Sequence, residues 1–142
     1  MITDTIKKKM ALFLKEYYGD SNAKMVVGTG GGSTNPLATE LDVPISTVTN
    51  GSTIAATSSD DKVVEFKATF TGSTLQGYTI REMGIFGSLP QDDQFDELAN
   101  TNNTNNPEYT TEQTMLSRVN FDAIGNFSTS DTVEVIFTME VE

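Results

Sequence analysis

The amino-acid sequence predicts a mainly β protein, in which antiparallel sheets pack like a β-sandwich and one N-terminal α-helix precedes them. Residues 63–70 and 132–141 alternate between apolar and polar side chains, which is typical of strands with one buried face. Residues 4–18 instead show a helical spacing of apolar side chains. A chain of 142 residues with 37% apolar residues is long enough to bury one core. We therefore expect a single domain over residues 1–142.

The helix is predicted over residues 4–18. Its apolar residues are spaced four, three, one and three positions apart, which places them on one helical face: Ile6, Met10, Phe13, Leu14 and Tyr17. Thr3 or Asp4 is suited to cap the start of the helix, and Gly19 is suited to end it. The lysines at residues 7–9 lie near the positive end of the helix dipole, which either water or a neighbouring acidic surface would relieve.

The β body is expected over residues 24–86 and 115–142. Short runs of β-favouring residues are separated there by clusters of Gly, Pro, Asn, Ser and Asp. Asn50-Gly51 is the strongest hairpin signal, because a type I′ turn needs positive φ at both central residues. We expect strands at residues 45–49 and 53–57 to pair across this turn.

Residues 87–114 are expected to leave the β body as an excursion. They are acidic over residues 89–98 and almost entirely polar over residues 100–107. A connection so long and so poor in apolar residues is uncommon inside a compact domain. We expect either a mobile loop or a segment that a neighbouring subunit orders.

The composition argues against catalysis and against several kinds of partner. The 20 acids and 9 bases give a net charge of −11, a field that repels phosphate, so we expect neither nucleic acid nor an anionic membrane surface as a partner. Histidine and cysteine are both absent, which removes the commonest general base and the commonest transition-metal ligands. Lys15 and Glu16 end the apolar run at residues 10–14, so we expect no export signal and no membrane insertion.

The motifs that resemble chemical sites lack the necessary context. The glycine-rich residues 28–33 are followed by Asn35-Pro36, whereas a phosphate loop requires Gly-Lys-Ser/Thr or a helix directly after the glycines. The acids at residues 92–97 lack the alternating spacing of a calcium loop. No two carboxylates are placed across a predicted cleft, as glycoside hydrolysis requires. We therefore predict no enzyme, no catalytic residue, no cofactor and no metal site.

Arg81 and Glu82 stand within the otherwise apolar residues 77–86. One reading is that they pair with opposite charges across the sheet and fix the strand register or an interface. The other reading is that both point at water.

The parity of the same stretch is irregular. Met83 and Ile85 share one parity, while Ile80 and Phe86 share the other. Either Gly84 marks a bulge or a close backbone approach, or the strand is buried on both faces. We expect a central strand that is covered on both sides.

Residues 80–86 (IREMGIF) resemble the N-terminal attachment domain of phage tail-collar fibre proteins, in which a strand of the form I-R-E-hydrophobic-G-hydrophobic-F recurs. The order of other features is similar. Residues 25–32 (MVVGTGGG) resemble the VGDGGG turn of that family, and residues 35–41 (NPLATEL) resemble its NP…L.NE stretch. The resemblance spans nearly the whole chain in short pieces.

The resemblance implies a non-enzymatic structural component of a tailed virus particle that infects a bacterium or an archaeon and assembles in the host cytoplasm. It implies an adaptor at the tail tip, baseplate or collar that docks fibres or neighbouring tail proteins, because no shaft or tip follows the last predicted strand. The expected partners are other virion proteins and copies of this chain. The candidate subunit-interface residues are Arg81, Glu82 and Phe95 of the excursion. The alternatives are a head decoration or turret protein and a carbohydrate-binding module for host attachment.

Overall fold

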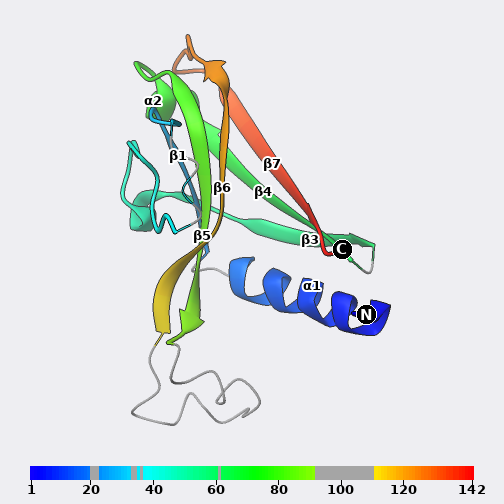
Figure 1. Cartoon of the computed structure of the whole chain (residues 1–142). Coiled ribbons are helices and arrows are strands. Elements are labelled where there is room, and N and C mark those ends of the chain that lie inside the picture. Colours follow the sequence, from blue (N-terminus) through cyan, green and yellow to red (C-terminus); the bar gives the residue numbers. More distant parts are fainter. Residues whose placement is uncertain (20–22, 33–34, 36, 61, 92–110) are drawn as a thin grey trace.

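The structure is a computed structural model that describes residues 1–19, 23–32, 35, 37–60, 62–91 and 111–142. As predicted, it is mainly β, with two antiparallel sheets and an N-terminal helix (Figure 1). The first sheet has the strand order β2-β1-β5-β6 and is formed by Ser52–Thr53, Lys24–Gly28, Ile80–Pro90 and Thr111–Ile124. The second sheet has the order β3-β4-β7 and is formed by Ala55–Asp60, Val63–Thr71 and Thr132–Glu140.

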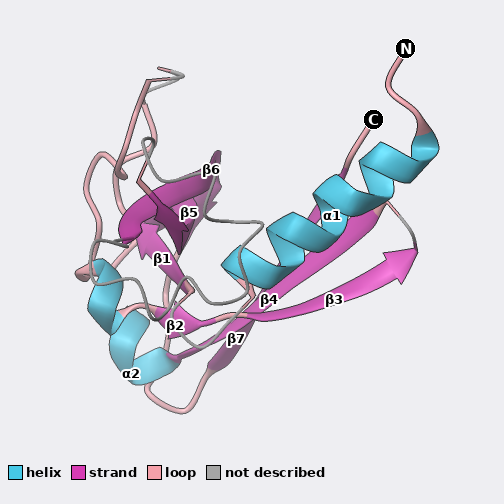
Figure 2. Ribbon diagram, turned by 90° about the horizontal axis from the view of Figure 1, so that it is seen from below, coloured by secondary structure: helices cyan, strands magenta, loops and turns pink. Residues whose placement is uncertain are grey.

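The two sheets form a wedge. They come together where β6 leads into β7, and they diverge toward the helix α1, Asp4–Tyr18 (Figure 1). Seen from below, α1 lies across the second sheet with its C-terminal end directed at the first (Figure 2). It contacts β5 of the first sheet and β3 and β4 of the second. The helix therefore fills the open end of the wedge. Two short helical turns, η1 (Val48–Asn50) and α2 (Gly72–Leu75), complete the fold.

The predicted bounds of the helix are confirmed. The Thr3 hydroxyl accepts a hydrogen bond from the Ile6 N–H at 3.4 Å, as an N-cap does. Gly19 ends the helix with φ −122°, outside the left-handed region, so its role is spatial rather than conformational. A β-carbon on Gly19 would overlap that of Ala56 in β3. Glycine thus allows the end of α1 to pack directly on the second sheet.

The helical face that packs differs from the predicted one. Ala11 and Tyr18 are each only 2% exposed, whereas Ile6 is 52% and Met10 is 45% exposed. The buried face is therefore rotated by about one residue from the predicted apolar face, although Leu14 belongs to both. The small Ala11 side chain lets the helix backbone approach the strands closely, and this leaves the larger side chains of the neighbouring positions outside.

The predicted alternation in the second sheet is confirmed. Val64, Phe66, Ala68 and Phe70 of β4 are buried, and β4 pairs with β7 without interruption from Val63↔Glu140 to Thr71↔Thr132. The apolar residues of β7 alternate with exposed ones but are only partly buried. β7 lies at the edge of its sheet, so the core covers these side chains incompletely.

The hairpin predicted at Asn50-Gly51 is wrong. Gly51 has φ −68°, and its N–H donates to the Val48 carbonyl at 2.9 Å in a 3₁₀ turn. The strands on either side do not pair with each other, because β2 pairs with β1 and β3 pairs with β4. A β-carbon on Gly51 would lie 2.8 Å from the Met25 carbonyl oxygen, so glycine is required there by close approach to β1 and not by a positive φ.

The expected excursion at residues 87–114 is shorter in the structure. β5 continues to Pro90 and β6 begins at Thr111, and these two residues pair in the sheet. Residues 87–90 and 111–114 therefore belong to the β body. The acidic and asparagine-rich segments, residues 92–110, lie outside the described residues.

The rotated helix face gives the first prediction. Replacing Ala11 with Leu should lower the free energy of unfolding by about 1–3 kcal/mol, because the added carbons overpack a filled contact. Replacing Met10 with Ala should change it by roughly 0.5 kcal/mol or less, because Met10 lies on the surface of the chain. Urea unfolding followed by circular dichroism measures both changes. The assignment would be wrong if Met10→Ala proved to be the costlier change.

Candidate functional site

β5 is the central strand of the first sheet and is covered on both faces, as expected. It pairs with β1 on one side and with β6 on the other. Met83 and Ile85 lie in the core between the sheets, while Phe86 packs with Val26 and Leu41 in a second apolar cluster. Each parity of the strand therefore meets its own core, so the run of apolar residues needs no single buried face.

The irregular parity has a further cause in the pairing with β6. The register shifts between Ile80 and Glu82 and again between Ile85 and Phe86. The first shift lets Ile80 join the same core as Met83, although the two differ in parity. Gly84 lies between the two shifts, and a β-carbon there would be 2.9 Å from the Phe86 ring and 3.0 Å from Leu41. Gly84 therefore permits close packing in the second cluster.

Glu82 is fully buried at 0% exposure and forms the centre of the candidate site. Its Oε2 lies 3.2 Å from Nη2 of Arg118 on β6 and accepts the Asp42 N–H at 3.1 Å. Its Oε1 accepts the Val43 N–H at 2.8 Å. An isolated buried carboxylate is very costly, and charge-assisted hydrogen bonds of this kind are what offsets the cost.

Arg118 joins a second acid to this group. Its Nη2 lies 2.6 Å from Oδ2 of Asp42, and the Arg118 side chain is only 9% exposed. Asp42 Oδ2 also accepts the N–H groups of Gly31 at 3.4 Å and Gly32 at 3.2 Å. One guanidinium thus links β5 and β6 to the loop at Asp42 and, through it, to the glycine-rich residues. Arg118 Nε is buried and has no hydrogen-bond partner within the described part of the chain.

The glycine-rich residues pack around this ion-pair group. Gly28 lies opposite Glu82 in the β1–β5 ladder, and a β-carbon there would overlap the Glu82 carboxylate. A β-carbon on Gly30 would be 2.5 Å from the Asp42 Cβ. Gly31 has φ +110°, which L side chains rarely adopt. These glycines make room for Glu82 and Asp42, and the turn is structural rather than a phosphate cradle.

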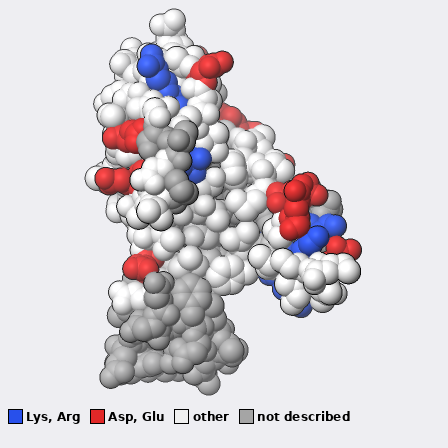
Figure 3. Space-filling model, viewed as in Figure 1, with Lys and Arg blue, Asp and Glu red and all other residues white. Residues whose placement is uncertain are grey.

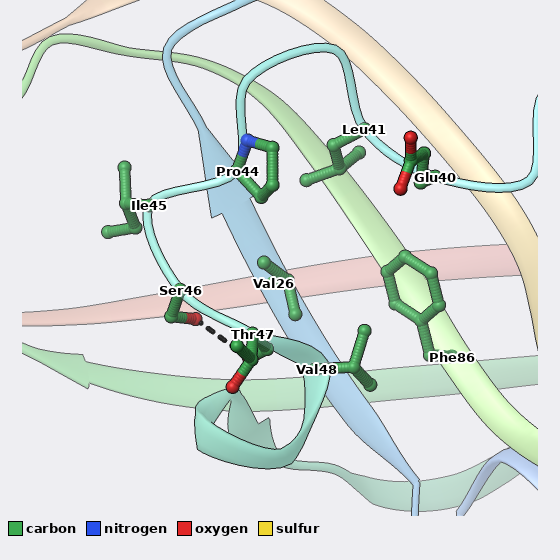
Figure 4. Close-up of a pocket in the computed structure, with 9 residues that line it drawn as sticks. All are labelled: Val26, Glu40, Leu41, Pro44, Ile45, Ser46, Thr47, Val48 and Phe86. Carbon is green, nitrogen blue, oxygen red and sulfur yellow. Dashed lines mark hydrogen bonds between the residues drawn. The ribbon is translucent and has the colours of Figure 1, made fainter.

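A pocket of about 420 Å³ lies next to this group, between β1, β5 and the returning segment at residues 40–48 (Figure 4). Its lining is mainly apolar, and Glu40 is the charged residue within it: Val26, Glu40, Leu41, Pro44, Ile45, Ser46, Thr47, Val48 and Phe86. Figure 4 shows Leu41, Val26 and Val48 directed toward the Phe86 ring. The pocket has the size and character to hold a small apolar side chain, and no pair of facing carboxylates lines it.

The three predicted interface residues have different positions. Arg81 is exposed on β5, so its interface role stays a prediction. Glu82 forms charged pairs across the sheet, as one of the two readings expected, and its carboxylate contacts groups of its own chain. Phe95 lies outside the described residues.

Asp42 and Arg118 were missed by the sequence analysis. Arg118 is one of only two arginines in the chain, and an acid inside an apolar strand requires a cation nearby, so this pairing carried a weak signal. Asp42 carried none, because nothing local distinguishes it from other loop acids.

Within the described residues, no group of three or more Asp, Glu, His or Cys side chains is arranged to hold a metal ion. Likewise, none of the helices in the described ranges has the length and apolarity needed to cross a membrane. Comparison with protein-family models and with curated proteins found no significant match.

The ion-pair group gives a prediction about stability. Glu82→Gln or Arg118→Met alone should lower the free energy of unfolding by about 3–5 kcal/mol, because each leaves a buried charge with too few partners. The double variant should lose less than the sum of the two single losses. Denaturant unfolding of all four proteins gives the coupling energy.

Arg81→Gln is the matched control, since Arg81 is the exposed neighbour of Glu82 on the same strand. It should change stability by roughly 0.5 kcal/mol or less. Additive single losses, or an equal loss in the control, would contradict the central role of Glu82.

The glycine turn gives another prediction. Gly30→Ala should destabilise the protein because the new carbon meets the Asp42 Cβ at 2.5 Å, whereas Gly32→Ala should be almost neutral because nothing lies within 4 Å of that position. Thermal unfolding of the two variants should give a clearly lower midpoint for Gly30→Ala alone. A phosphate-binding turn would instead show stabilisation of the wild type by added phosphate or nucleotide, which we do not expect.

Proposed function

We propose that this chain is a non-enzymatic structural component of a tailed virus particle, an adaptor at the tail tip, baseplate or collar that assembles with copies of itself and with neighbouring virion proteins. The proposal begins from the resemblance to tail-collar fibre attachment domains. Its structural support is the way in which the resembling segments meet.

The three resembling segments, residues 25–32, 35–41 and 80–86, converge on one place. Gly28 and Gly30 pack on Glu82, and Leu41 packs with Phe86. Segments that lie far apart in the sequence thus form one interlocked unit around a buried charge. This is the observation that carries the proposal, because a chance likeness of short pieces gives no reason for them to contact one another.

The outer surface of the chain also suits assembly. β2, β6, β3 and β7 lie at the ends of the two sheets, so within the described residues each pairs with a strand on one side only. Unpaired strand edges favour contact with another chain. The partly buried apolar residues of β7 and the exposed stripe on α1 are further uncovered surface.

Immunogold labelling of purified tailed particles tests this proposal. An antibody raised against the recombinant chain should bind at the tail tip, baseplate or collar of particles whose genome encodes it, and an antibody against the major capsid protein serves as the positional control. Gold on the head surface would favour a decoration protein instead. Particles that contain no copy of the chain by mass spectrometry would overturn the proposal.

A further inference from the structure

The face of α1 that does not pack on the sheets carries a continuous apolar stripe. Ile2, Ile6 and Met10 are spaced four residues apart and are each about half exposed, and Phe13 continues the row with its ring 4.7 Å from that of Tyr17. Residues four apart lie one above the other on a helix, so the stripe covers about three turns. The opposite face of the same helix is already used by its own chain.

A second apolar surface lies on the open side of the wedge, between β6 and β7. A small cavity there is lined only by apolar residues: Val27, Phe70, Leu75, Ile80, Met83, Phe121, Ile124, Phe127, Val133 and Val135. Ile124 is 53% exposed at its border. The surface between the first sheet, the second sheet and α1 is largely uncharged (Figure 3).

The charges that surround these two surfaces are of opposite sign. α1 carries four lysines and two acids, a net charge of +2, so the other residues of the chain together carry −13. β6 and β7 contain four acids, Glu112, Asp122, Glu134 and Glu140, of which Glu134 pairs with Lys67 at 3.3 Å. Their only basic residue, Arg118, is held by Glu82 and Asp42 in the buried group.

We propose that the apolar stripe of α1 in one copy docks on the open side between β6 and β7 of a second copy. The inference rests on the proposed function, of which it specifies the contact between copies. A chain with net charge −11 repels its own copies, and contact through the one basic helix reduces that repulsion. A helix of 15 residues is roughly 22 Å long and β7 of nine residues is roughly 30 Å, so the lengths are compatible.

This contact joins two different surfaces and is therefore heterologous. Each copy offers one helix and one open side, so a ring forms if the rotation between copies closes. The same contact would place the lysines of residues 7–9 near an acidic neighbour, which offsets their unfavourable position at the start of the helix.

Analytical ultracentrifugation of the full chain tests the contact. The wild type should form an oligomer, and Ile6→Glu/Met10→Glu should raise its dissociation constant at least about tenfold by placing charge in an apolar contact. Leu12→Glu is the matched control, because Leu12 is similarly exposed, at 42%, on another side of the same helix, and it should leave the dissociation constant within about twofold. Circular dichroism checks that all variants are folded.

Disulfide trapping supplies the geometry, because the natural chain contains no cysteine. A mixture of the Met10→Cys and Ile124→Cys variants should give the mixed disulfide on mild oxidation. A mixture of Met10→Cys and Val43→Cys should not, although Val43 is equally exposed at 53%.

The outcomes separate the two proposals. A wild type that stays monomeric at all concentrations overturns both this contact and the self-assembly part of the proposed function. An oligomer that resists Ile6→Glu/Met10→Glu, or that yields Met10 to Met10 disulfides instead of mixed ones, overturns this contact alone and leaves the adaptor role to the particle-labelling experiment.

Discussion

The structure depends above all on the burial of one carboxylate, that of Glu82. A charge at 0% exposure is stable only with specific partners, and here they come from β6 through Arg118 and from the backbone of residues 42–43. Gly28 must face Glu82 across the β1–β5 ladder, because any side chain there would overlap the carboxylate. The register of three strands and the path of two loops thus follow from the solvation of a single group.

Local patterns predicted the elements but not their partners. The bounds of α1 and the buried positions of β4 follow from periodicity within one segment, which is why the sequence indicates them correctly. The partners of Glu82 are 40 and 36 positions away, at Asp42 and Arg118. No local period encodes a contact over that distance. What the sequence does contain is the need for a cation, since an acid stands in an apolar strand of a chain with two arginines.

The two misread features share a physical reason. Asn50-Gly51 has the chemistry of a hairpin turn, but its glycine serves the close approach to the Met25 carbonyl. The apolar face of α1 was read as the buried one, but Ala11 gives the shorter distance to the sheets and takes that place. In both cases the smallest residue decides how closely two segments approach. Hydrophobicity and turn propensity describe a residue alone, whereas this role exists only after the segments have met.

The pairing of β4 with β7 has a consequence for the way the chain is made. β7 completes the second sheet over nine consecutive positions, yet about sixty residues separate the two strands in the sequence, including the whole of β5 and β6. Closing such a loop is slow, and β4 has only β3 as a sheet partner until β7 has been synthesised. During translation the apolar residues of β4 are therefore covered late. The nascent chain has to pass through a half-built state in which association with other copies must be avoided.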